Sequence, residues 1–566
     1  FEESWHDVRI RKFWMNQSNP SIIVVVCNTG IYKTTNALET DPNMVVWLKV
    51  SDNLSSLQAD GEEIFLDIVQ MPGNENELYA SGDSTVYWSH NMGDTWEIIA
   101  EMEQLEYPDA NDDIELNISN PFDAEDLNQR IALRVSPANP DLLYVFASVK
   151  FPASGIKDSE FSFALFNRTT YNWNNYFKSI NYYAPYRSQS VAVSPTDESV
   201  VYYGNSRKMK KLILEFEDQD VISTTLLSVN KNWHDDIHYL KFASDNESIW
   251  MAHDGGIAIG SPVNETEYSI TFDWQNHYKG LGISNLYNVA HSERKPERLL
   301  YGAQDTGCAL KTENENWKVV YGGDGYAVKF HPTYPDISFV STQGDLKGSL
   351  NNGANYYLVH DSHHGFKMNF NQVNNNILYT AGEGIKELTF TDLPNSLAKT
   401  TRNLSENQYP NYECYNVWAA PNDENVVYAN LKNKDDGFDH LLVRSTNANA
   451  PVADIVWENL YTMGGWTDVY EANNDGSTDL LFPKLAIDDE DPLKCWVLAS
   501  SWGTTEDKFF LLENNAWSLF DPERKLGIIN PTFIVHQYGS NDRIYVGTDR
   551  GVYYTEPSLN IEWVKL

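Results

Sequence analysis

The sequence has few cysteines. They are Cys27, Cys308, Cys414 and Cys495, and no two of them form a CxxC pair. Four scattered cysteines are too few for a disulfide-dense secreted module, and they lack the spacing of a structural zinc site. One or two isolated disulfides remain compatible with the sequence, and the redox compartment is left open.

Positive charge is also scarce. The chain has 41 Lys and Arg against 80 Asp and Glu, which gives a formal net charge of −39. Nucleic acids and anionic membrane surfaces are recognised by Lys/Arg clusters, so neither is expected as a partner. The acidic surplus serves solubility and also suits divalent cations. We therefore expect no cofactor, with Ca²⁺ as the alternative.

Several other signals are missing. The sequence contains no run of 18 apolar residues, so no direct membrane insertion is expected. It has no G-x-S-x-G elbow, no phosphate-binding glycine loop and no sustained helical period. The chain starts at Phe1 in the middle of a strand pattern, from which we expect a processed chain or a fragment of a longer protein.

The composition instead favours β-structure, and a motif repeats along the chain. Aromatic residues make up 13% of the sequence and hydrophobic residues 42%, a combination that suits strands. The repeat is an apolar strand, a turn rich in Pro, Asn and Asp, and a second apolar strand. Its clearest copies are residues 69–79, 135–144 (VSPANPDLLY), 193–202 (VSPTDESVVY), 330–339 (HPTYPD in the turn) and 420–428. Weaker copies begin near Phe13, Phe242, Ala290, Phe370, Leu485 and Ile534.

This repeat predicts an all-β protein of the β-propeller class. Propeller blades have four strands and run to about 40–50 residues, so the spacing predicts about eleven blades. Rings usually hold about four to eight blades. The favoured arrangement is therefore two tandem rings, a first propeller region at 1–285 and a second at 286–566. The alternative is one large ten-bladed ring.

Two sets of residues carry a family resemblance. Residues 89–96 (SHNMGDTW) match the pattern S-x-D-x-G-x-T-W, with Asn91 at the usual Asp position. Between 233 and 325 the segments WHDDIH, HDGGI, QDTG and GGDG follow one another. In this order they resemble the secreted sortilin-like, Asp-box (BNR) repeat propellers of the Bacteroidetes type and, more distantly, the tandem-propeller xyloglucanases.

The resemblance implies a secreted or cell-surface propeller in which the Asp-box is a structural hairpin turn. It does not carry over catalytic residues, since no aspartate here matches a xyloglucanase catalytic motif. The cysteine-rich module of the sortilin receptors is also missing.

Aspartates in the same stretch are the candidate functional acids. They lie in loops that end strands, and such loops of a propeller gather on one face. Two of these carboxylates could act as acid and base on a glycosidic bond, or hold Ca²⁺. Asp before Gly is also a favourite pair in plain turns, and a purely structural role in turns is the favoured interpretation of these aspartates. The candidates for hydrolysis are Asp254, Asp305 and Asp324, and the candidates for ligand binding include Asp235 and Asp236.

Two further groups are candidates for binding. His234, Asp236 and His238 alternate along an expected strand, which places them on one face as part of a metal site. Trp173, Tyr182 and Tyr183 belong to an aromatic, Asn-rich tract that suits stacking on sugar rings. Burial of the same rings under a loop is the alternative.

Three functions are compatible with these observations. The first is a non-catalytic extracellular or cell-surface propeller module that binds a polysaccharide or a protein partner. The second is a glycoside hydrolase acting on β-glucan or xyloglucan with an aspartate acid/base pair. The third is a structural component of a secretion or adhesion assembly.

Overall fold

Among the described residues, the regular secondary structure is almost entirely β-strand. The computed structural model describes residues 8–566 except 42–43, 53, 55–63, 83–84, 102–129, 151–158, 177–189, 205–206, 218–219, 278–284, 314–315, 364–366, 436–438, 467–482, 500–508, 528–529 and 557–560. Contacts between Cα atoms divide the chain into two compact units, unit 1 (Phe1–Gly282) and unit 2 (Ile283–Leu566). Within the described residues, no helix has the length and apolar character needed to cross a membrane.

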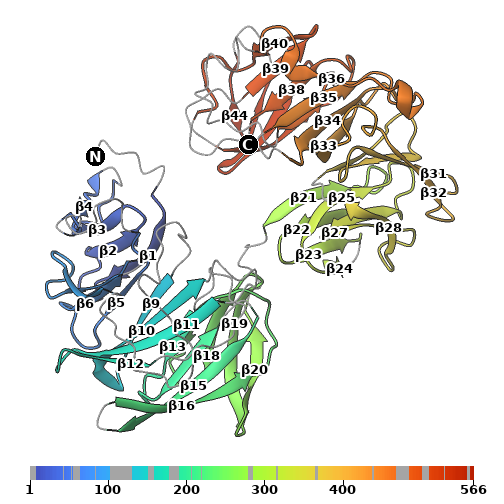
Figure 1. Cartoon of the computed structure of the whole chain (residues 1–566). Coiled ribbons are helices and arrows are strands. Elements are labelled where there is room, and N and C mark those ends of the chain that lie inside the picture. The colour runs from blue at the N-terminus through green and yellow to red at the C-terminus, as the bar shows by residue number, and fades with distance from the viewer. Residues whose placement is uncertain are drawn as a thin grey trace. The chain divides into compact units, whose positions relative to one another are not determined.

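Unit 1 contains five groups of four consecutive strands in its described part (Figure 1). The groups are β1 (Ile10–Met15), β2 (Ile23–Cys27), β3 (Gly30–Thr34) and β4 (Leu48–Lys49); β5 (Asp67–Gln70), β6 (Leu78–Ser81), β7 (Thr85–Ser89) and β8 (Glu97–Glu101); β9 (Arg130–Ser136), β10 (Asn139–Lys150), β11 (Ser159–Asn167) and β12 (Asn172–Tyr176); β13 (Ser190–Val193), β14 (Val200–Gly204), β15 (Met209–Glu217) and β16 (Asp220–Val229); β17 (Ile237–Phe242), β18 (Ile249–His253), β19 (Gly256–Glu265) and β20 (Ser269–Asn276). A short parallel pairing of β16 with β20 joins the last two groups into one eight-stranded sheet.

Unit 2 contains six such groups among its described residues. They are β21 (Leu286–His291), β22 (Leu299–Ala303), β23 (Gly307–Lys311) and β24 (Lys318–Tyr321); β25 (Gly325–Phe330), β26 (Ser338–Thr342), β27 (Gly344–Ser349) and β28 (Tyr357–His363); β29 (Met368–Phe370), β30 (Ile377–Thr380), β31 (Lys386–Phe390) and β32 (Lys399–Asn403); β33 (Tyr412–Ala419), β34 (Val427–Asn433), β35 (His440–Ser445) and β36 (Glu458–Asn459); β37 (Lys484–Ile487), β38 (Cys495–Leu498), β39 (Phe509–Glu513) and β40 (Ala516–Leu519); β41 (Pro531–His536), β42 (Ile544–Thr548), β43 (Gly551–Thr555) and β44 (Val564–Lys565). Two 3-10 helices, η5 (Val452–Asp454) and η6 (Leu460–Thr462), flank β36.

Apolar clusters lie between consecutive groups of strands. Trp88 and Leu133 share a cluster that joins the second group to the third, and Phe339 and Phe370 share one that joins the seventh to the eighth. First strands of neighbouring groups also contact one another, as β5 does with β9 and β25 with β29. Antiparallel four-stranded sheets stacked in this way are the blades of a β-propeller, so the predicted fold class is confirmed. The groups are called blades 1 to 11 below, in chain order.

The Pro/Asn/Asp segments of the sequence repeat form the turns between first and second strands. In these turns one side chain caps the backbone at the end of the first strand. The Ser194 hydroxyl accepts from the N–H of Thr196, the Asn371 carbonyl oxygen from that of Val373, and the Asp488 carboxylate from that of Glu490. The N–H groups of these turns have no partner in the strand ladders, so polar side chains accept their hydrogen bonds instead. The repeat is therefore visible in the sequence as a polar segment between two apolar strands.

The turn at 89–96 joins the third and fourth strands of blade 2. Ser89 Oγ accepts from the N–H of Gly93 at 2.8 Å, and Asn91 Oδ1 accepts from that of Thr95 at 2.9 Å. The indole of Trp96 is buried in the core between blades 1 and 2. Asn at the usual Asp position therefore still closes the turn, because its carbonyl oxygen replaces the carboxylate as acceptor.

The same turn occurs at the same place in blade 7, where the sequence pattern is degraded. Ser349 Oγ accepts from the N–H of Gly353 at 3.0 Å, and Asn351 Oδ1 accepts from that of Asn355 at 3.1 Å. Tyr356 stands where the first copy has Trp and packs against the apolar cluster between blades 6 and 7. Sequence analysis missed this copy because the final Thr-Trp pair has become Asn-Tyr.

A buried ionic cluster connects the first strands of blades 1, 2 and 3. Asp67 begins β5 and is paired with Lys12 of β1 and with Arg134 of β9, whose Nη1 lies 2.8 Å from Asp67 Oδ2. The backbone N–H of Leu133 donates to the same oxygen at 3.0 Å. One carboxylate of blade 2 thus binds to both neighbouring blades, 1 and 3.

The protonation states of this cluster are set by burial and by charge. Burial alone would raise the pKa of Asp67, but Lys12 and Arg134 outweigh burial and hold that pKa below its ordinary value of 3.8. Burial also lowers the pKa of Lys12. The loss of water around its ammonium group lowers this pKa by more than the attraction of Asp67 raises it. Arg134 is the second cation paired with this carboxylate.

Replacing Asp67 with Asn should destabilise the chain by about 3–5 kcal/mol, because Lys12 and Arg134 would be left without their anion. The stabilisation from Asp67 should be fully present above its unfolded pKa of 3.8 and be lost as the pH falls through the lower folded value. Calorimetry of both chains between pH 7 and pH 3 measures this. Asp52→Asn is the control, since the exposed Asp52 pairs with Lys49 at 3.7 Å and should contribute less than about 1 kcal/mol. Equal effects of the two substitutions would contradict the assignment.

Candidate functional site

In unit 1 the candidate residues lie around the start of blade 5. Asp235 and Asp236 lie between β16 and β17, His238 lies in β17, and Asp254 lies in the turn between β18 and β19. Nε2 of His238 contacts Oδ1 of Asp254, which joins two of the predicted residues. Asp236 has a left-handed backbone conformation (φ 61°), which suits an Asp in a turn.

Asp235 is held by cations from two sides. Lys231 pairs with Oδ1, and Nε of Arg207 lies 3.5 Å from Oδ2. Lys231 is four residues earlier in the same link, whereas Arg207 belongs to the segment before β15. The side chain of Asp235 therefore fastens this link to blade 4.

The structure adds His253, which sequence analysis did not select, at the end of β18. Its ring lies 6.2 Å from that of His234, nearly parallel to it, and the residue is 6% exposed. Burial, followed by the electrostatic effect of the neighbouring His234, lowers the pKa of His253 to about 4. His253 is thus neutral at pH 7. His253 directly precedes the candidate acid Asp254 in the HDGG segment. That neighbouring position is the sequence signal from which His253 could have been selected.

In unit 2 the predicted Asp305 and Asp324 are in direct contact. Asp305 lies in the turn between β22 and β23, and its N–H donates to Oδ1 of Asp324 at 2.8 Å. The side-chain amide of Gln343 donates to Oδ2 at 2.9 Å. Asp324 thus joins the second-to-third-strand turns of blades 6 and 7. Asp254 lies in unit 1, so these acids are divided between the two units.

Glycine is required beside these aspartates. Gly307 follows Asp305 at φ 77°, and a Cβ on it would lie 2.1 Å from the carbonyl oxygen of Tyr321. A Cβ on Gly325, next to Asp324, would lie 2.4 Å from the carbonyl oxygen of Gly307. The QDTG and GGDG segments therefore have a structural role: they bring the two backbones of blades 6 and 7 into contact.

The aromatic candidates lie elsewhere in unit 1. Trp173 in β12 is partly buried, with its ring 5.0 Å from that of Phe166, and its Nε1 donates to the carbonyl oxygen of Ile99. This places Trp173 against the core between blades 2 and 3. Tyr182 and Tyr183 lie outside the described residues.

Three lysines of unit 2 form a group that the sequence did not reveal. Lys329 lies in β25, Lys484 begins β37, and Lys367 immediately precedes β29, so all three lie in or directly before first strands of blades. Nζ of Lys367 lies 5.3 Å from the ring centre of Trp418 in β33 and 5.0 Å from that of Phe533 in β41. A lysine of blade 8 thus reaches the first strands of blades 9 and 11.

The charges of Lys484 and Lys329 act on the ammonium group of Lys367. Burial, then the charges of Lys484 and Lys329, lower the pKa of Lys367 to about 7. Burial likewise lowers the pKa values of Lys329 and Lys484. The carboxylate of Glu293 raises the pKa of Lys329 but offsets the effect of burial only in part. Within the described part of the chain none of the three forms an ion pair, although acidic side chains outnumber basic ones 80 to 41. These three residues are called the lysine cluster below.

Comparison with solved structures finds β-propeller proteins. A GH74 enzyme of Niastella koreensis matches with a TM-score of 0.51 at 14% identity, over 98% of this chain and 75% of that chain. An ancestral GH74 enzyme matches with a TM-score of 0.43 at 13% identity, over 99% of this chain and 92% of that one. PorZ, an essential bacterial surface component of the type-IX secretion system of Porphyromonas gingivalis, matches with a TM-score of 0.41 at 12% identity, over 99% and 81%.

At this level of identity the first match supports the fold alone, and it agrees with the propeller predicted from the sequence. No protein-family model matches the sequence, and no curated protein matches it in sequence. The chain is a β-propeller protein similar in fold to the Niastella koreensis enzyme.

The burial of His253 gives a testable pH dependence. Its folded pKa of about 4 is below the ordinary value of 6.5, so protonation favours the unfolded state. The contribution of His253 to stability should therefore be present above pH 6.5 and be lost as the pH falls toward 4. His253→Phe should lose less stability than the parent chain over that range in calorimetry. His90→Phe, at a half-exposed position paired with Glu97, is the control. Identical pH profiles of the parent and His253→Phe chains would show that His253 titrates normally.

Proposed function

We propose that this chain is a non-catalytic β-propeller module that acts outside the cell or on its surface. It binds a polysaccharide or a protein partner through an anionic group that enters the lysine cluster of unit 2. Each compact unit forms one propeller region, divided near residue 286. The turn hydrogen bonds at 89–96 and 349–356 support a place among Asp-box repeat propellers.

The observation that carries this proposal is the lysine cluster. Placing three cations near one another costs free energy in the unliganded chain, since each ammonium is partly removed from water and only Lys329 is partly compensated, by Glu293. A carboxylate, sulfate or phosphate group would offset that cost through charge-assisted hydrogen bonds. Phe533 beside Lys367 is 46% exposed and adds an apolar surface on which a sugar ring could stack, whereas Trp418 is buried beneath the same lysine.

The net charge restricts the ligand further. A chain with a net charge of −39 repels a dense polyanion at long range, although salt screens this repulsion beyond about 10 Å. A partner whose anionic groups are sparse avoids most of the repulsion and still fills the cluster. We therefore favour a polysaccharide with occasional acidic substituents over a heavily sulfated one.

The contacts of the candidate acids support a non-catalytic function. Glycoside hydrolysis needs two carboxyl groups facing the same bond, about 5–10 Å apart. Asp324 instead accepts hydrogen bonds from Asp305 and Gln343, and Asp254 is paired with His238. These carboxylates serve turns and neighbouring side chains.

Binding should be measured by calorimetry with a sparsely carboxylated polysaccharide, a heavily sulfated one and neutral xyloglucan. Because an anion stabilises the charged form of Lys367, binding should be tighter at pH 6 than at pH 8. Lys367→Met should weaken binding about tenfold or more, equivalent to ~1.4 kcal/mol. The same substitution should leave stability equal or higher, since it removes an unpaired buried charge. Lys434→Met replaces an exposed lysine of the same unit and should change neither binding nor stability.

The outcomes separate the alternatives. Binding that Lys367→Met leaves intact would disprove the role of the cluster. Binding to no polymer, together with capture of a surface protein that depends on Lys367, would favour the protein partner.

A second experiment tests the non-catalytic part of the proposal. Release of reducing ends from β-glucans and xyloglucan should be at background level for the parent chain. It should also be unchanged in the Asp254→Ala, Asp305→Ala double variant. Release that disappears in the variant would establish a hydrolase that uses those acids.

A further inference from the structure

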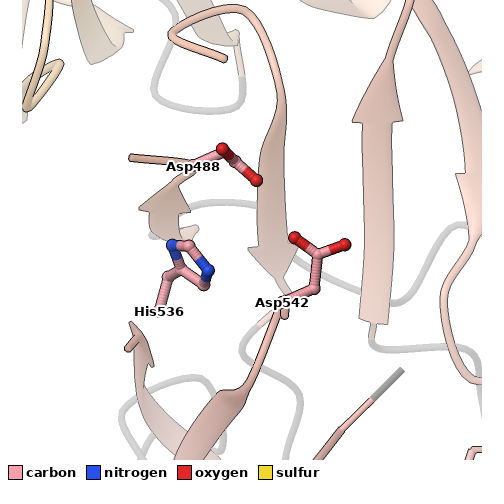
Figure 2. A group of neighbouring side chains, drawn as sticks. All are labelled: Asp488, His536 and Asp542. Atoms are coloured by element: carbon pink, nitrogen blue, oxygen red, sulfur yellow. The ribbon is translucent and has the colours of Figure 1, made fainter. Parts of the chain in front are cut away.

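A second charged group lies in unit 2 where blade 10 meets blade 11. Asp488 directly follows β37, His536 ends β41, and Asp542 lies in the turn between β41 and β42. One ligand atom from each of these side chains lies within 4.8 Å of the other two. Figure 2 shows the imidazole ring and the two carboxyl groups facing a common space.

His536 is the unusual member of this group. Its side chain is 2% exposed, and neither ring nitrogen has a hydrogen-bond partner within the described residues. A buried polar group left without a partner costs about 1–3 kcal/mol. The indole of Trp496, with its ring centre 4.9 Å away, covers the imidazole and restricts the approach of water.

Neighbouring residues already orient the potential ligands. Oδ1 of Asp489 lies 3.5 Å from Nδ1 of His536, and the N–H of Gly539 donates to the other oxygen of Asp489 at 2.7 Å. A carboxylate beside Nδ1 leaves Nε2 as the nitrogen available to a metal, as in many histidine sites. Asp488 Oδ1 caps the turn by accepting from the N–H groups of Glu490 and Asp491, and Oδ2 remains for a cation.

Lys494 is the cation now present between the two carboxylates. Its Nζ lies 2.8 Å from Oδ2 of Asp542 and 3.3 Å from Oδ2 of Asp488. It also lies 3.6 Å from Glu513, which offers a second place for the ammonium. Lys494 pairs with these carboxylates and does not satisfy His536, whose ring nitrogens have no hydrogen-bond partner among the described residues.

We propose that Asp488, His536 and Asp542 bind a divalent first-row transition metal, for which Zn²⁺ is the best fit, at the contact between blades 10 and 11. One imidazole and two carboxylates match the ligand preferences of Zn²⁺, whereas Ca²⁺ and Mg²⁺ take oxygen ligands. Ligand atoms around tetrahedral zinc lie about 3.3 Å apart. Contraction from 4.8 Å or less therefore needs only side-chain movements. Lys494 moves to Glu513 when the metal enters.

The metal competes with Lys494 for the two carboxylates, so removing the lysine and removing a ligand should change zinc affinity in opposite directions. Zn²⁺ is titrated into the full chain by calorimetry at pH 7. Asp542→Asn removes a ligand charge, and Asn tolerates the left-handed conformation at this position (φ 58°), so the turn is preserved. This substitution, and His536→Ala, should weaken zinc binding by at least the 10–100-fold that loss of an outer-shell partner costs. Lys494→Gln should tighten binding about tenfold.

His291→Ala is the matched control, since His291 is an exposed histidine of the same unit and should leave binding unchanged. Anomalous scattering at the zinc edge should place the ion between the three side chains. Equal zinc affinity of the parent and Asp542→Asn chains, or no tightening in Lys494→Gln, would overturn the proposal. Either result would show that Lys494 is a permanent structural counter-ion.

Discussion

The structure depends on the stacking of blade faces. A four-stranded sheet has two faces, and a single blade can cover neither of them. The apolar side chains of each blade are therefore buried only against the next blade, as Trp88 is against Leu133 and Phe339 against Phe370. Stability is thus built pairwise along the chain, as in other repeat architectures. A fully buried Phe or Leu contributes about 1.5–3 kcal/mol to such a contact.

Stacking places the first strands of successive blades side by side, and this concentrates charge in a few positions. An ionic side chain on a first strand can therefore meet residues that are far away in sequence. Asp67 meets Lys12 and Arg134 in this way, and Lys367 meets Trp418 and Phe533. The same geometry that produces the cores therefore also decides which charges are neutralised and which are not.

The difference between contacts within a turn and contacts between blades explains which features could be predicted from the sequence. Strands and their turns were predictable because each turn has a local chemical signature, such as the caps at Ser194 and Asn371. The turn at Asn351 was missed since its aromatic residue changed, although its hydrogen bonds did not. For the predicted acids, Asp305 and Asp324 do meet, but through a backbone N–H that no sequence pattern encodes. The lysine cluster and His536 were missed because their partners come from other blades and carry no spacing signal.

Three buried charged groups differ in how well they are balanced, and the difference has a functional meaning. At Asp67 the cations and the carboxylate satisfy one another, aided by the N–H of Leu133, so the cluster is structural. At Lys367 positive charge is in excess, and burial together with the neighbouring lysines lowers the pKa of its ammonium to about 7. At His536 the carboxylates exceed the single ammonium of Lys494, and the imidazole has no hydrogen-bond partner in the described part. An unbalanced buried charge destabilises a chain unless a ligand of opposite sign completes it. The first imbalance therefore favours an anion and the second a metal cation.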